Sequence, residues 1–201
     1  MASGKPRKGA MTKARKPVAG RHPEQKGIDR DLVYTALRFG GYFAAMSFVV
    51  LALLPLDFIE WLQLITTDVA AALMLLVGLP LTREGILIHL PEATLQIDLG
   101  CTAIVIIGVY ASLILAYKAS AVERLIGIVA GTAFILVINQ IRLVATGLAL
   151  QYAPSAFGLL HDYLYQVVMV AVVLAAWAVW LRWLAGRADA ADTNDGSAGG
   201  R

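Results

Sequence analysis

Apolar runs long enough to cross a bilayer constrain the fold of this chain more than any other feature. The hydrocarbon core is about 30 Å thick, so a helix needs roughly 20 apolar residues to span it. The chain has 201 residues, is 59% apolar and 15% charged, and has a mean hydropathy of +0.70. Its apolar runs lie at residues 39–56, 62–81, 99–117, 125–150 and 163–183. We therefore expect an all-α integral membrane protein.

The second run, residues 62–81, differs from the other four. It contains Gln63 and Asp68, and its uninterrupted apolar part covers only about 11 residues, which is short of a span. We therefore expect four transmembrane helices and assign this run to an interfacial or re-entrant helix. Between residues 85 and 99, apolar side chains alternate on both sides of Pro91, which predicts a small extracytoplasmic β-hairpin.

The basic residues between the runs favour this topology, because cytoplasmic loops are enriched in Lys and Arg. If residues 62–81 do not cross the bilayer, the basic N-terminal segment and most later cations fall on one side, with Arg83 on the other. Those later cations are Lys118, Arg124, Arg182 and Arg187. We therefore expect a multi-pass protein of the cytoplasmic (inner) membrane with both ends in the cytoplasm.

Polar segments flank the apolar region. Residues 1–30 hold nine Lys or Arg against Glu24 and Asp29, with no aromatic residue. Such a segment cannot bury enough apolar surface to fold. We expect a disordered basic cytoplasmic tail at 1–30, a transmembrane domain at 31–187 and a disordered tail at 188–201. The basic tail suits anionic membrane lipids, whereas a nucleic-acid partner would require interleaved aromatic residues and is not expected.

Three residues stand out against the apolar background: Cys101, Arg142 and His161. An arginine at the centre of a membrane helix costs about 2.5 to 3.5 kcal/mol on insertion scales, so it indicates a functional role. Cys101 opens the run at 99–117, and reflecting its position about the turn near residue 120 leads to a position near 140, at about 1.5 Å per residue. His161 opens the last run. The topology predicts that the three side chains meet just inside the outer membrane boundary.

These residue types are those of a thiol acyl-transfer site. A cysteine thiolate is a strong nucleophile, and its pKa, about 8.5 in a free thiol, falls beside a cation or a helix N-terminus, both of which we expect at Cys101. His161 can exchange protons near neutral pH, and Arg142 can hold an oxyanion with its fixed fork of donors. Asn139 and Asp162 are candidates for orienting these groups.

The same residues have simpler interpretations. A free cysteine is often a small buried hydrophobic residue, His161 and Asp162 can form an interfacial pair, and Asn139 can hydrogen-bond between helices. An alternative from another class is a non-enzymatic membrane assembly or transport subunit, in which Arg142 binds an anionic ligand or lipid. With one cysteine and no Cys/His cluster at zinc spacing, we expect no disulfide, metal or cofactor.

Several segments resemble one family of membrane enzymes. The segments at residues 76–80 (LVGLP), 83–85 (REG), 88–91 (IHLP) and 98–103 (DLGCTA) are similar to the approach to the active-site cysteine of the exosortases and archaeosortases. Residues 139–143 (NQIRL) resemble the family's asparagine and arginine segment, and 161–166 (HDYLYQ) its histidine segment. The chain is similar to the short exosortases of the H type.

This resemblance implies a membrane-embedded cysteine protease or transpeptidase with Cys101 as nucleophile and Arg142 and His161 as its partners. It implies substrates that are exported proteins with a C-terminal sorting signal, cleaved at the outer face of the cytoplasmic membrane, with water or an amine resolving the acyl intermediate. The chain departs from the family at one place: members commonly have glycine two residues after the cysteine, where this chain has Ala103.

Overall fold

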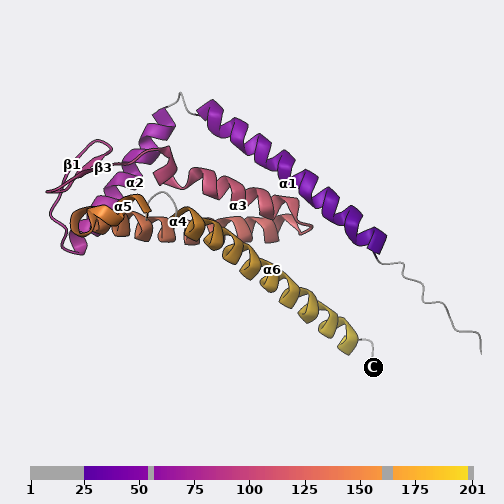
Figure 1. Ribbon diagram of the computed structural model, residues 1–201. Helices are drawn as coiled ribbons and strands as arrows, with labels where there is room; N and C mark the ends of the chain where they lie inside the picture. The colour runs from indigo at the N-terminus through magenta and orange to yellow at the C-terminus, as the bar shows by residue number, and fades with distance from the viewer. Residues whose placement is uncertain (1–24, 54–56, 160–164, 199–201) are drawn as a thin grey trace, which may run out of the picture.

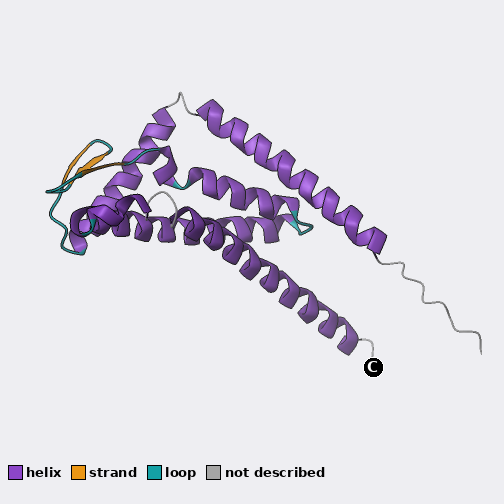
Figure 2. Ribbon diagram, in the orientation of Figure 1, coloured by secondary structure: helices purple, strands orange, loops and turns teal. Residues whose placement is uncertain are grey.

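The computed structural model describes residues 25–53, 57–159 and 165–198, which are helical apart from one small sheet (Figures 1 and 2). The elements, in chain order, are α1 (Gln25–Leu53), α2 (Asp57–Leu76), β1 (Thr82–Glu84), β2 (Leu87–His89), β3 (Thr94–Gln96), the 3₁₀ turn η1 (Leu99–Thr102), α3 (Ile104–Ala116), α4 (Ala121–Tyr152), η2 (Pro154–Ala156), α5 (Phe157–Leu159) and α6 (Tyr165–Ala198). Within the described residues, four helical segments are long and apolar enough to cross a membrane, namely Leu32–Ala52, Asp57–Leu76, Ala121–Tyr152 and Tyr165–Arg187. The predicted class and the number of such helices are confirmed.

The membership of this set differs from the prediction in two places. α2 is a continuous helix of 20 residues, so the argument that its apolar part is too short to span was wrong. Thr66 and Thr67 do not interrupt it, because their hydroxyls donate to the carbonyls one turn earlier at 2.8 and 2.7 Å. α3 has only 13 residues, about 20 Å in length, because the run predicted to span from residue 99 begins with η1.

α2 does not run alongside the other helices. In Figure 1 it crosses the end of the bundle at which the sheet, η1 and α5 lie, while the α3–α4 turn lies at the opposite end. It contacts α4 and η1, and its Met74 packs so closely on Gly147 of α4 that a Cβ there would lie 2.8 Å from the methionine methyl. α2 is itself long and apolar enough to cross a membrane, and its interfacial or re-entrant role stays a prediction.

The sheet has the order β1-β2-β3, and all its strands are antiparallel. The predicted hairpin is confirmed in β2 and β3, which pair Ile88 with Leu95, both buried. β1 escaped prediction because all three of its residues are exposed and show no alternation. It joins β2 through Gly85, whose φ of +57° suits the first position of a two-residue hairpin turn. Arg83, opposite Ile88, forms a 2.9 Å ion pair with Asp68 and so anchors the sheet to α2.

The bundle core is built where two large aromatic side chains reach the backbone of α4. Tyr110 of α3 lies against Gly131 and donates a 2.9 Å hydrogen bond to the carbonyl of Gly127. Trp180 of α6 lies against Gly127 and donates from Nε1 to the carbonyl of Glu123 at 3.0 Å. A side chain at either glycine would overlap these rings, so the small residues permit close packing of the three helices.

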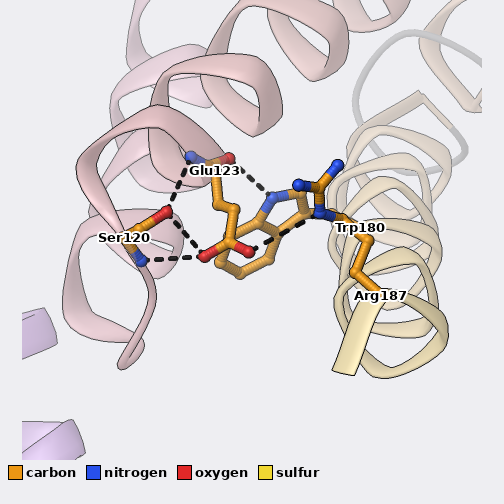
Figure 3. A network of polar contacts seen from close by, with 4 residues as sticks. All are labelled: Ser120, Glu123, Trp180 and Arg187. Carbon is orange, nitrogen blue, oxygen red and sulfur yellow. Dashed lines mark hydrogen bonds and ion pairs between the residues drawn. The ribbon is translucent and has the colours of Figure 1, made fainter. Parts of the chain in front are cut away.

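The start of α4 is fixed by a capping box, shown in Figure 3. Ser120 Oγ accepts a hydrogen bond from the Glu123 N–H at 3.3 Å, and Glu123 Oε2 accepts one from the Ser120 N–H at 2.9 Å. This exchange satisfies two backbone donors at the helix end. Because the cap follows the end of α3 by only a few residues, it sets which residues of α4 lie beside η1.

The helices extend beyond the predicted domain boundaries. α1 begins at Gln25, inside the segment expected to be a tail, and α6 continues to Ala198, past the boundary expected at residue 187. Residues 1–24 and 199–201 lie outside the described part of the chain. Disorder of the two tails therefore stays a prediction.

Candidate active site

Cys101 lies in the 3₁₀ turn between the sheet and α3. Asp98 caps this turn: its Oδ1 and its backbone carbonyl both accept the Cys101 N–H, each at 3.1 Å. The hydroxyl of Thr102 donates to the carbonyl of Leu99 at 2.7 Å. Cys101 is only 4% exposed and belongs to a core formed by α2, the sheet and α4. The turn therefore holds the cysteine rigidly and already uses its backbone N–H.

Ala103 ends the turn in the left-handed conformation, with φ 61° and ψ 5°. It is the one described residue other than glycine with a positive φ, and it is 2% exposed. This conformation costs an L-residue with a side chain about 1 to 2 kcal/mol. Glycine, which the resembled family commonly has at this place, adopts it without that cost. The departure noted in the sequence therefore lies at a position whose backbone conformation favours glycine.

Asn139 of α4 joins the turn to the bundle. Its Nδ2 donates a hydrogen bond to the carbonyl of Cys101 at 2.7 Å, and the side chain is fully buried. This contact agrees with the reflection through the α3–α4 turn, which placed position 101 beside position 140. The Oδ1 atom of Asn139 is buried and has no hydrogen-bond partner in the described part of the chain.

Arg142 follows Asn139 by three residues and so lies on the same face of α4. Its backbone carbonyl accepts a 2.8 Å hydrogen bond from the Thr146 hydroxyl. Its Nε is buried and, among the described residues, has no hydrogen-bond partner. Buried donors are normally satisfied, so an unpaired one calls for an explanation. Arg142 thus has a hydrogen-bond donor near Cys101 that no described residue accepts.

The pKa of the Cys101 thiol depends on its burial and on the charges of Asp98 and Arg142. Burial raises the pKa of Cys101 above its ordinary value, and it is the largest effect. A hydrogen bond with the Asp98 backbone lowers the pKa, the charge of the Asp98 carboxylate raises it, and the charge of Arg142 lowers it. Among the described residues, Arg142 alone does not overcome burial, and the expected contribution of protonated His161 stays a prediction. A thiol of this kind needs a base to become a nucleophile at neutral pH.

His161 and Asp162 lie outside the described residues, so their positions stay predictions. The described elements on either side of them are α5, which ends at Leu159, and α6, which begins at Tyr165. Figure 1 shows both of these ends at the end of the bundle that carries η1 and the sheet. The structure thus brings together Cys101, Asn139 and Arg142 of the predicted set.

Two polar residues near the cysteine were missed in the sequence. Asp98 caps η1, and Gln63 of α2 donates from Nε2 to the carbonyl of Ile97 at 3.2 Å, which ties α2 to the strand that leads into the turn. Asp98 was detectable, because an acidic residue three positions before the cysteine matches the spacing of a helix cap. Gln63 carried no comparable signal. Within the described residues, no three His, Cys, Asp or Glu side chains are grouped so that they could hold a metal ion.

Comparison with known proteins places this geometry in a family. The chain matches the transmembrane exosortases of the EpsH type over residues 33–178. The matched range begins in α1, ends in α6 and contains Cys101, Asn139, Arg142 and the predicted His161. No curated protein and no solved structure matches the chain.

The pH dependence of Cys101 reactivity tests the electrostatic description. We expect modification by methyl methanethiosulfonate, a small neutral reagent, to accelerate with pH through a midpoint above the value of about 8.5 for a free thiol. Asp98→Asn should lower this midpoint, because it removes a negative charge, and Arg142→Gln should raise it, because it removes a positive one. Glu92→Gln, at an exposed carboxylate between β2 and β3, is the matched control and should leave it unchanged. A midpoint below that of free cysteine would contradict the dominance of burial.

The strain in the left-handed backbone of Ala103 can be tested by substitution. Stability is measured by thermal unfolding of the protein in detergent. Ala103→Gly should stabilise the protein by up to about 1 kcal/mol, because it relieves the left-handed residue. Ala103→Val should destabilise it, because a β-branched residue tolerates a positive φ poorly. In the control at Ala133, exposed on α4, glycine should instead lower stability by about 0.5 to 1 kcal/mol. Glycine effects of the same sign at both positions would refute the strain at Ala103.

Proposed function

The chain belongs to the transmembrane exosortase family, and we propose that it is a membrane-embedded cysteine protease or transpeptidase. Its substrates are exported proteins with a C-terminal sorting signal, which it cleaves at the outer face of the cytoplasmic membrane. Cys101 is the nucleophile, Arg142 stabilises the oxyanion and His161 carries the proton. Asn139 and Asp162 orient these groups.

This proposal rests on one observation: of the two hydrogen-bond donors considered near Cys101, its own backbone N–H is engaged and the Arg142 Nε is not. Oxyanion sites in acyl transfer need donors that are positioned before the charge develops. The backbone N–H of Cys101 is already held by Asp98 at 3.1 Å, so it is not available for this task. The buried Nε of Arg142, which has no hydrogen-bond partner among the described residues, is available. Its permanent charge also suits an anionic oxygen better than a neutral donor does.

The proposed reaction has two stages. His161 accepts the thiol proton, and the Cys101 sulfur attacks the carbonyl carbon of the scissile peptide, forming a C–S bond while the carbonyl electrons move onto an oxygen held by Arg142. The tetrahedral intermediate collapses, the C–N bond breaks, and the leaving amine takes the proton from His161. Water or an amine then attacks the thioester, and the proton that it loses returns to the sulfur.

The short α3 helix supports a site within the outer part of the bilayer. α3 rises about 20 Å from the α3–α4 turn, while the hydrocarbon core is about 30 Å thick. If the turn lies at the cytoplasmic face, as its basic residues indicate, Cys101 lies several ångströms below the outer boundary. Asn139, which bonds to the Cys101 carbonyl, lies in this same layer, as does the Arg142 Nε, for which the described residues offer no hydrogen-bond partner. Electrostatic interactions are stronger there because water is scarce.

The sheet and α2 offer a place for the substrate motif. A cavity of about 470 Å³ lies between α2 and the β1–β2 turn, and its lining includes Glu60, Gln63 and Glu84. Gln63 connects it to the site, because the same side chain is bonded to the carbonyl of Ile97, four residues before Cys101. β1 lies at one edge of the sheet that the described residues form, so an extended peptide can add to it.

Replacement of the nucleophile tests the proposal in the native host. Cys101→Ala and Cys101→Ser should leave proteins with sorting signals at their uncleaved size on a gel, while the variant enzyme accumulates normally in the membrane. Arg142→Lys keeps the charge but loses the fork of donors, and we expect a loss of about 10²- to 10³-fold in processing rate. Arg182→Lys, at an exposed arginine of α6, is the control.

Unchanged processing in both Cys101 variants would overturn the enzymatic proposal and favour the alternative subunit in which Arg142 binds an anion. Loss of processing in Arg182→Lys to the same degree as in Arg142→Lys would show that the effect does not arise from the oxyanion donor.

A further inference from the structure

A second cavity lies in the half of the bundle away from Cys101. It has a volume of about 440 Å³ and runs between α4 and α6, with small residues of both helices along its walls. Aromatic rings of Tyr110, Phe134, Trp180 and Trp183 line it. We refer to it as the α4–α6 groove. The proposed reaction makes no use of it.

The groove opens on the surface that faces the bilayer. Phe134 on α4 and Val179 on α6 both line it, and they are 46% and 67% exposed. Both helices are long and apolar enough to cross the membrane. The groove can therefore be filled by apolar groups from the bilayer and not by water.

The dimensions fit a hydrocarbon chain better than a helix. The lining residues extend over positions 175–183 of α6, a rise of about 12 Å. A helix segment of that length and about 10 Å across occupies roughly 900 Å³, twice the volume of the groove. A partner helix could enter only partway, whereas an extended chain fits within the walls.

One end of the groove carries a fixed positive charge. The Arg187 guanidinium lies 5.0 Å from the centre of the Trp183 ring, which lines the groove. Figure 3 shows Arg187 reaching toward Glu123, whose Oε2 is already bonded to Ser120 at 2.9 and 2.7 Å. The remaining Oε1 lies 3.8 Å from Arg187 Nε, which is longer than a charge-assisted hydrogen bond of about 2.7 to 2.9 Å.

The charge of Arg187 is therefore only loosely engaged, and its side chain is 60% exposed. The α3–α4 turn, the start of α4 and the later part of α6 contain Lys118, Arg124, Arg182 and Arg187 beside the acidic residues Glu123, Asp189 and Asp192. Basic pockets at the ends of membrane helices suit anionic lipid headgroups. A guanidinium also matches the geometry of a phosphate better than an ammonium does.

We propose that the α4–α6 groove is a binding site for an anionic phospholipid, with one acyl chain between the helices and the phosphate at Arg187. The acyl chain covers the exposed aromatic and aliphatic residues of the groove. The phosphate pairs with the Arg187 guanidinium, which Glu123 approaches only to 3.8 Å. The site is separate from Cys101 and does not depend on the reaction proposed there.

Quenching of Trp180 and Trp183 by brominated lipids tests this site. The full chain, carrying Trp61→Phe and Trp177→Phe so that these two tryptophans report alone, is placed in vesicles of equal phosphatidylglycerol and phosphatidylcholine. Bromine is carried on the chains of only one lipid at a time, so the surface charge stays constant. Brominated phosphatidylglycerol should quench the tryptophan fluorescence at least twofold more than brominated phosphatidylcholine does.

Matched variants separate the two parts of the site. Arg187→Gln should abolish the preference for the anionic lipid, whereas Arg182→Gln, at an exposed arginine on the same part of α6, should preserve it. Ala130→Phe, which fills the groove from α4, should reduce quenching by both lipids, whereas Val129→Phe, at an exposed position outside the lining, should not. Equal quenching by the two lipids in the unaltered groove would overturn the proposal. So would an absence of quenching, which would indicate a protein segment in the groove.

Discussion

The hydrogen bond from the Asn139 amide to the carbonyl of Cys101 is the contact on which the site depends. At 2.7 Å and with Asn139 fully buried, it joins an irregular turn to α4, a helix of 32 residues at the centre of the bundle core. A buried carbonyl left without such a partner costs about 1 to 3 kcal/mol, and in an apolar surrounding no water can replace it. The bond therefore fixes η1 at one depth along α4. Arg142, on the same face, is brought to the cysteine by the same contact.

The short α3 helix follows from the turn that precedes it. Because Asp98 caps η1 and Ala103 adopts a left-handed conformation, the α-helix cannot begin before Ile104. The cysteine is thus placed at the entrance of α3. The consequence is a raised pKa of the Cys101 thiol, and burial is its largest cause. A nucleophile that rests in its neutral form is compatible with a membrane, where a permanent thiolate would be costly to bury, and it makes the proposed proton carrier His161 necessary.

Much of this arrangement was predictable from sequence, and the failures have physical causes. The apolar runs and the basic residues between them predicted the membrane class, and counting residues about one turn placed Cys101 beside Asn139. The hairpin was visible because apolar side chains recur at every second position on both sides of Pro91, at Ile88 and Leu90 and at Leu95 and Ile97. β1 was not visible, because it buries no side chain. The length of α2 was misjudged because Thr66 and Thr67 satisfy their hydroxyls within the helix. Burial of the thiol depends on residues far apart in the chain, so no local pattern reveals it.

The hydrogen bond between Asn139 and Cys101 joins two atoms that can be labelled with isotopes. The chain has one cysteine, and its two asparagines are Asn139 and Asn194. Solid-state NMR of the protein in lipid bilayers, with ¹³C at the cysteine carbonyl and ¹⁵N at the asparagine side-chain amide, measures their dipolar coupling. The 2.7 Å hydrogen bond predicts strong dephasing from a carbon–nitrogen distance below about 4 Å, lost in Asn139→Leu. Absence of dephasing in the native chain would contradict the account, because Cys101 and Arg142 would then have no common anchor.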